Sequence, residues 1–368
     1  MKSWKSTLFQ AAVATGLVAY GATAQANPGS SENALMERLN ALEAQLAEML
    51  IVQDEAAAAA PAAASSGESL EASWKNGLKL SNADGSSYVK LFGRVQWDAL
   101  FFQEDRDVRL ALGKQADGVL ARRMRIGLAG RINKHFIYKA EYDFATGAAA
   151  FTDVWIGIDD LPKVGPFIKT LKVGHQKTPF GLEQNVSSKH TTFMERGLTD
   201  ALDFGFDTGL TVAGGIESGK VMADWKVGIM KSVGAFGTGA NNGEWYLALR
   251  ETNKFQVNDD MYIVAGVSAM YGSPSGDAVA YADSTELNTM SSGAGAGAGA
   301  KSEYRVGIEV AAVWKGLTFQ SEVMYAKAER PSGSTLNDPE PWAAYAQVSY
   351  MLTGEKPGEI IRRARAVP

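Results

Sequence analysis

About a dozen segments of roughly ten residues, in which apolar and polar side chains alternate, follow one another between residues 88 and 352. In the first, residues 88–102, Leu91 and Val95 fall on one face of an extended strand and Arg94 falls on the other. Each segment therefore separates an apolar surface from a charged one. The pattern limits the chain to an all-β fold, either a soluble sheet with one buried face or a membrane barrel with a polar lumen.

The N-terminus has the features of a secretory signal peptide. Two lysines form a short positive region, residues 8–22 are apolar, and Ala24-Gln25-Ala26 forms a small-residue cleavage site. An uncleaved membrane anchor is the alternative, but the apolar stretch is short for a membrane span. We therefore expect residues 1–26 to be removed on export. An export signal followed by many strands that carry charges on one face predicts a transmembrane antiparallel β-barrel.

Composition narrows the possible functions. The chain has no cysteine, which excludes disulfides, thiolate metal sites and thiol chemistry. Its formal net charge of −5 argues against nucleic acid as a partner. No GxSxG motif is present, and His190 and Glu195 lack a zinc-binding spacing. Asp153 and Asp159 fit a strand and a polar turn better than an acid–base pair. We expect no enzymatic activity, no metal and no cofactor.

The segment before the strands has a different pattern. Leu35, Leu39, Leu42, Leu46 and Met49 recur at spacings of four and three, which predicts a short coiled coil within residues 27–54. An isolated amphipathic helix is the alternative. An Ala-rich linker is expected over residues 55–80, and a barrel domain over residues 81–355.

The expected strands cover residues 88–102, 119–132, 136–145, 151–159, 168–176, 208–216, 220–230, 244–251, 261–271, 303–315, 317–327 and 342–353. Short joins between them suit periplasmic turns. The two long joins, residues 178–207 and 272–302, suit external loops or loops that fold into the lumen, and the second contains a Gly-Ala repeat.

Alternation also assigns charged side chains to the lumen. Arg123, Arg125 and Arg131 share one face of the second strand, and Lys139 and Lys172 lie on the corresponding faces of later strands. Cations that line a water-filled pore attract anions, and guanidinium groups suit phosphate because they bind two oxygens at once. Alternatively, these cations pair with the carboxylates of the same strands and only brace the wall.

Residues 172–196, KVGHQKTPFGLEQNVSSKHTTFMER, resemble the signature region of the phosphate-selective porin O/P family. The matching elements are a strand that ends in KVG, a Lys-x-Pro-Phe turn, and Ser-Ser near a Phe-Met-Glu-Arg box. The upstream segment RRMRIGLAGRI and the downstream segment AYAQVSYMLTGE are also similar to that family.

The resemblance implies a trimeric, sixteen-stranded outer-membrane barrel that passes phosphate or polyphosphate by passive diffusion. It also implies that residues 178–207 fold into the barrel, with Lys177 and Lys189 as pore cations and Arg196 as a brace against Glu195. The pattern accounts for about twelve strands. Residues 356–368 form a basic tail without the terminal aromatic residue usual for such barrels, so we expect a truncated or divergent end.

The candidate pore-lining cations are therefore Arg94, Arg123, Arg125, Arg131, Lys139, Lys172, Lys177 and Lys189. The expected partners are inorganic phosphate or other small anions, outer-membrane lipid, and further copies of the chain in a homotrimer. Two alternative functions remain open. One is a general porin without selectivity, and the other is a structural tether in which the N-terminal helix positions the barrel near the cell wall.

Overall fold

The computed structural model of the chain describes residue 44 and residues 69–103, 105–114, 117–145, 147–161, 167–233, 245–273, 281 and 300–353. The expected signal peptide, the coiled coil apart from residue 44, the linker as far as residue 68 and the C-terminal tail lie outside these residues. Ser69–Pro368 form a compact unit separate from Met1–Glu68, and all described strands belong to it.

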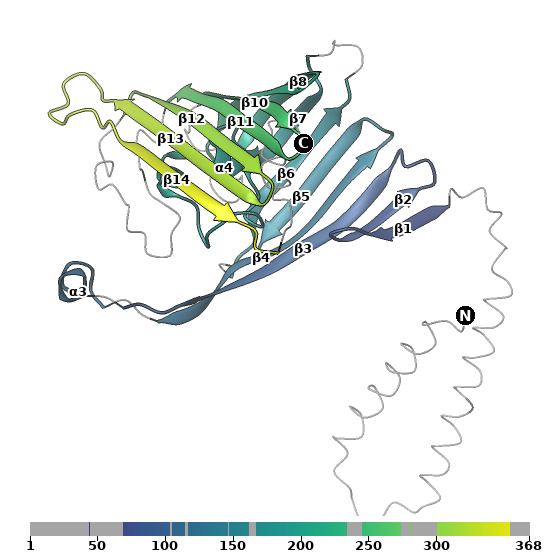
Figure 1. Cartoon of the computed structure of the whole chain (residues 1–368), viewed down its shortest axis with the longest axis horizontal. Helices are drawn as coiled ribbons and strands as arrows, with labels where there is room; N and C mark the ends of the chain where they lie inside the picture. The colour runs from purple at the N-terminus through teal and green to yellow at the C-terminus, as the bar shows by residue number, and fades with distance from the viewer. Residues whose placement is uncertain are drawn as a thin grey trace, which may run out of the picture. The chain divides into compact units, whose positions relative to one another are not determined.

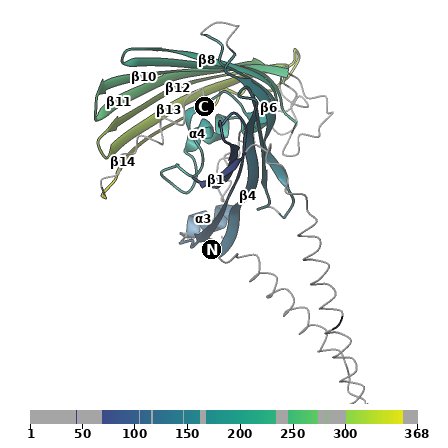
Figure 2. The same ribbon diagram turned by 90° about the vertical axis from the view of Figure 1, so that its right-hand side faces the viewer.

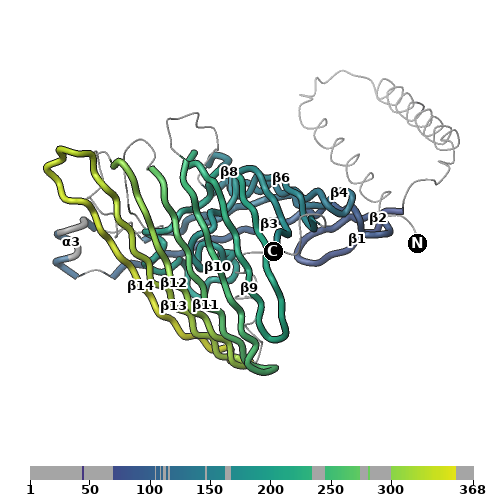
Figure 3. The backbone as a smooth tube through the Cα atoms, turned by 90° about the horizontal axis from the view of Figure 1, so that it is seen from above, coloured from purple at the N-terminus to yellow at the C-terminus, as the bar shows by residue number. Residues whose placement is uncertain are grey.

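Fourteen strands form one antiparallel sheet, in which each strand pairs with the strands that precede and follow it in the sequence (Figure 1). They are β1 (Leu70–Trp74), β2 (Leu78–Asn82), β3 (Tyr88–Leu100), β4 (Gly118–Ile132), β5 (Phe136–Asp143), β6 (Ala150–Asp159), β7 (Thr170–Lys177), β8 (Phe206–Ser218), β9 (Val221–Lys231), β10 (Trp245–Asn258), β11 (Met261–Gly272), β12 (Ser302–Trp314), β13 (Leu317–Glu329) and β14 (Trp342–Tyr350). Seen from above, β9 to β14 lie side by side in this order (Figure 3).

All the strands expected from the alternating pattern are present, and their ends agree within about three residues except in β10. That strand continues to Asn258 because Asn253 and Lys254 keep their pairing partners on both β9 and β11. Its second half was not expected because residues 250–254, RETNK, interrupt the alternation with five polar residues in a row.

Two strands were not expected, and the linker is correspondingly shorter than residues 55–80. β1 and the start of β2 lie within that range. Each strand has only five residues, too few for alternation to distinguish from an irregular segment. Gly77 joins them with a φ of 130°, and a Cβ there would lie 2.3 Å from the carbonyl oxygen of Leu91. The turn therefore requires glycine.

Between β7 and β8 the chain folds onto one face of the sheet, which we call the inner face. This infolded segment, residues 178–205, contains the short helix α4 (Leu182–Asn185) and the 3-10 helix η1 (Leu198–Leu202). Figure 2 shows α4 within the curve of the sheet. A further helix, α3 (Arg106–Leu112), follows β3. Within the described residues no helix is long and apolar enough to cross a membrane.

The two faces of the sheet have opposite character. On the outer face Val95, Ile156 and Ile308 are 64%, 69% and 62% exposed. On the inner face Arg250 and Glu309 are 2% exposed each and form an ion pair, with Nη2 of Arg250 2.5 Å from Oε1 of Glu309. Apolar groups outside and charged groups inside reverse the distribution of a water-soluble protein and are typical of a wall between lipid and a polar lumen.

The sheet is curved but is not closed over the described residues. The strand order runs from β1 to β14 without a pairing between these two edges in the part of the chain that the structure describes. β3 is paired with β2 only from Tyr88 to Leu91, and its remaining residues pair with β4 alone. Over the described residues the structure thus shows an antiparallel all-β sheet of fourteen strands, whereas the resemblance implies sixteen.

Candidate functional site

The infolded segment is attached to β12 and β13 by buried hydrogen bonds. Oε1 of Glu322 accepts a hydrogen bond of 2.6 Å from the backbone N–H of Leu182, and Oε2 accepts one of 3.2 Å from the hydroxyl of Thr199. Nη1 of Arg305 donates to the carbonyl oxygen of Leu202 at 2.8 Å. Both helical turns of the segment are therefore held by side chains of the sheet.

On its other side the infolded segment reaches β4 through Glu195. Its carboxylate pairs with Nε of Arg122 and, at 3.2 Å, with Nη2 of Arg123. The expected brace between Arg196 and Glu195 is wrong. Nε of Arg196 instead donates to the carbonyl oxygen of Glu183 at 3.0 Å, and Nη1 lies 3.8 Å from Asp200. Adjacent residues point to opposite sides here, so Glu195 meets the sheet while Arg196 stabilises the segment itself.

A β-bulge brings Arg122 to the inner face. Gln96 of β3 is opposite Arg123, but the next residue, Trp97, is opposite Ala121, so Arg122 has no partner in the ladder. Regular alternation would place Arg122 on the outer face, because Arg123 is on the inner one. The bulge instead allows both neighbours to face inward. The alternation of apolar and polar residues in the sequence does not indicate this bulge.

A cavity of about 470 Å³ lies between the infolded segment and β3–β7. Eight lysine or arginine side chains and two carboxylates are among its lining residues. These charged residues are Arg94, Arg122, Arg123, Arg125, Lys139, Lys177, Lys189, Arg196, Glu141 and Asp153. The cavity is thus strongly cationic, and six of the eight candidate pore cations meet there.

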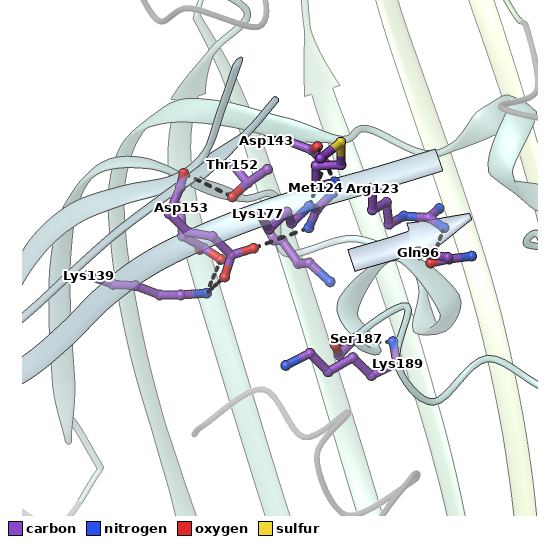
Figure 4. A network of polar contacts seen from close by, with 12 residues as sticks. Gln96, Arg123, Met124, Lys139, Asp143, Thr152, Asp153, Lys177, Ser187 and Lys189 are labelled. Atoms are coloured by element: carbon purple, nitrogen blue, oxygen red, sulfur yellow. Dashed lines mark hydrogen bonds and ion pairs between the residues drawn. The ribbon is translucent and has the colours of Figure 1, made fainter. Parts of the chain in front are cut away.

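Several of these cations are paired with carboxylates of the same wall. Nε of Arg125 lies 2.6 Å from Asp143, and Nη1 lies 3.2 Å from Glu141. Lys139 lies 2.6 Å from Asp153 (Figure 4). It also lies 3.1 Å from Glu141. The bracing interpretation therefore describes Arg125 and Lys139 well, since each has two carboxylate partners.

Arg94 and Lys189 are different. Arg94 is directly opposite Arg125 in the β3–β4 ladder, and its Nη1 is buried without a hydrogen-bond partner among the described residues. Lys189 lies on the infolded segment and has no ion pair within the described part of the chain. Burial, followed by the nearby charge of Arg94, lowers the pKa of Lys189. Neither group forms an ion pair with a carboxylate of the described residues, although the charge of Glu141 acts on both.

Three further candidates make contacts within the fold. Nζ of Lys177 donates to the carbonyl oxygens of Gln184 and, at 2.8 Å, of Val186, so it fixes the end of α4. Two candidates do not line the cavity. Arg131 pairs with Asp159 at 2.6 Å beside a turn, and Nζ of Lys172 lies 4.3 Å from the ring centroid of Trp155.

Neutral polar residues complete the cavity. Asn185, Ser187, Ser188 and His190 of the infolded segment line it beside Lys189. The amide group of Asn185 donates to the carbonyl oxygens of Thr178, Phe180 and Gly181 and so stabilises the segment itself. Figure 4 shows Ser187 and Lys189 together on this segment, apart from Lys139 and Asp153. The Ser-Ser pair is part of the signature region, but only the fold shows that it faces the same space as the arginines.

The chain was compared with family models, curated protein sequences and solved structures. Residues 89–359 match the family model described as phosphate-selective porin O and P. No curated protein sequence is significantly similar to the chain. Among solved structures, OmpT, an outer membrane protein of Vibrio cholerae folded in vitro, has 13% sequence identity and a TM-score of 0.37, covering 73% of this chain and 83% of that one. An anion-selective porin from Comamonas acidovorans has 12% identity and a TM-score of 0.28, covering 73% and 96%.

Proposed function

The chain belongs to the phosphate-selective porin O and P family, and we propose that it forms a water-filled, anion-preferring channel in the outer membrane. In this proposal phosphate or polyphosphate passes by passive diffusion through the cavity between the infolded segment and β3–β7. The strands close into a barrel, and three exported chains associate, aided by the leucine repeat within residues 27–54.

The observation that carries the proposal is the excess of cations in this cavity. Arg94 and Arg125 face each other across adjacent strands, where like charges destabilise a sheet. Arg125 is neutralised by Asp143 and Glu141, whereas Nη1 of Arg94 has no partner among the described residues. An anion between Arg94 and Lys189 would supply the missing charge, so its binding is favourable there.

The donor set favours an oxyanion over chloride. A guanidinium group presents parallel N–H donors that match two oxygens of a phosphate. Ser187 and Ser188 add neutral hydroxyl donors on the opposite side of the cavity. A phosphate has four oxygens and can accept hydrogen bonds from both sides at once, whereas chloride offers a single centre without directional fit.

Planar-bilayer recordings of the purified chain test the proposal. We expect a reversal potential under a potassium chloride gradient that indicates anion preference, and a chloride current that falls when phosphate is added. A channel without anion preference would support a general porin instead. A chain that inserts but does not conduct would support the structural tether.

A further inference from the structure

Glu195 is a carboxylate that the chain itself inserts between two cations of the cavity wall. Its side chain is 8% exposed and that of Arg123 is 5% exposed. Nη2 of Arg123 lies 3.2 Å from Oε2 of Glu195 and 3.5 Å from Oε1, and Nε of Arg122 donates to Oε1. Both oxygens are therefore bound by guanidinium groups, in the way that an oxyanion from solution would be bound.

The position of the infolded segment does not depend on this contact alone. Glu322 holds Leu182 and Thr199, and Arg305 holds Leu202, all on the opposite wall. Glu195 is thus an additional contact, between the segment and β4. Its two arginines line the same cavity as Arg94 and Lys189. A residue that competes with anions must bind cations that line the cavity, and Glu195 binds two of them. A residue that only braces the segment could bind elsewhere on the sheet.

Resting on the proposed function, we propose that Glu195 is a tethered counter-anion that competes with the permeating anion for Arg122 and Arg123. Because it is part of the chain, its effective concentration at the two arginines is high, on the order of millimolar or more. A monovalent anion such as chloride or acetate gains little by replacing it. A multivalent oxyanion can contact both guanidinium groups and can displace it. Glu195 therefore filters anions by charge and by number of oxygens.

Two variants separate competition from bracing, with acetate as the probe. In Glu195→Ala the carboxylate is gone and space for a small carboxylate is left at Arg122 and Arg123. We expect acetate to lower the chloride conductance of Glu195→Ala at concentrations about three- to tenfold below those that affect the wild type. In the isosteric variant Glu195→Gln we expect a stronger anion preference and a smaller ratio of phosphate to chloride affinity, because one negative charge is removed without a change of shape.

The matched control is Glu340→Gln, which removes a carboxylate that is 47% exposed and pairs with Lys327 away from the cavity. It should behave as the wild type. Adding Arg122→Gln and Arg123→Gln to Glu195→Ala should abolish the acetate effect. Folding of each variant is checked by heat-modifiable migration in gels, and if Glu195→Ala does not fold, the selectivity of Glu195→Gln decides.

Failure of the role proposed for Glu195 can be distinguished from failure of the proposed anion channel. If the wild type prefers anions but neither Glu195 variant changes acetate sensitivity or selectivity, Glu195 is only a brace and the inference is overturned. If the wild type shows no anion preference, the proposed function itself fails.

Discussion

Arg94 of β3 is directly opposite Arg125 of β4, and both guanidinium groups line one cavity. Two like charges in this position destabilise a sheet unless something neutralises them. Asp143 and Glu141 neutralise Arg125. Arg94 forms no ion pair with any described residue and its Nη1 is buried without a hydrogen-bond partner there, and we interpret this local imbalance as a site for a mobile anion.

Removing Arg94 should weaken phosphate binding without loss of the fold. In Arg94→Gln we expect the phosphate concentration that halves the chloride current to rise about tenfold, as for the loss of one charge-assisted hydrogen bond. Concentration series of phosphate in planar bilayers measure this value. Lys220→Gln, in the turn between β8 and β9, removes a positive charge away from the cavity and should leave it unchanged. Equal effects of the two variants would contradict a local site at Arg94.

Removing Glu322 should release the infolded segment. Glu322→Ala leaves the N–H of Leu182 and the hydroxyl of Thr199 without their acceptor, at a cost of about 2–5 kcal/mol. We expect a larger and noisier single-channel conductance, because the segment no longer holds its position on the inner face. Glu329→Ala lies on the same strand, where its carboxylate accepts an exposed hydrogen bond from Ser302, and is the control. Identical conductance of both variants would argue against the anchor.

Stability should fall as the pH rises, because of Asp203 at the end of η1. Burial, with the nearby charge of Asp200, raises the pKa of Asp203 from 3.8 to about 8. A group with a raised pKa holds its proton more tightly in the folded chain, so its contribution is full below about pH 4 and is lost as the pH rises to about 8. The loss amounts to about 2–5 kcal/mol.

Urea unfolding at about pH 5 and about pH 9 measures this dependence. Asp203→Asn should be less sensitive to pH than the wild type, since an amide does not ionise in this range. The control is Asp160→Asn at an exposed turn position with φ of 57°, which asparagine also tolerates. An unchanged slope in Asp203→Asn would show that another group is responsible.

Gly174 should be intolerant of any side chain. Its φ is 132°, and a Cβ would lie 2.4 Å from the carbonyl oxygen of Val154 on the adjacent strand. We expect Gly174→Ala to destabilise the fold by about 1–3 kcal/mol or more, measured by the urea midpoint. Gly85→Ala, at a φ of 68° but with no atom within 4 Å, separates backbone strain from the steric clash and should be milder.

Most of the sheet could be predicted from the sequence because the side chains of a strand point to the same face at every second residue. Arg94 and Val95 are neighbours in the sequence and lie on opposite faces of β3. The position of a strand and the face of each side chain can therefore be predicted from neighbouring residues alone. The same rule failed at β1 and β2, which are too short, and at the end of β10, where polar residues interrupt it. It also assigns Arg123, Arg125 and Lys139 to one face of the sheet, and in the structure these three residues line the cavity.

The contacts that shape the site required the tertiary structure. Glu195 and Arg122 are far apart in the sequence, and their pairing depends both on a bulge in β4 and on the path of the infolded segment. The attachment of Leu182 to Glu322 spans an even longer separation. Alternation is a property of neighbouring residues and therefore determined the strands and their two faces. Pairing between the infolded segment and the sheet depends on which distant residues the fold brings together, so only the tertiary structure decided which cations form ion pairs with carboxylates.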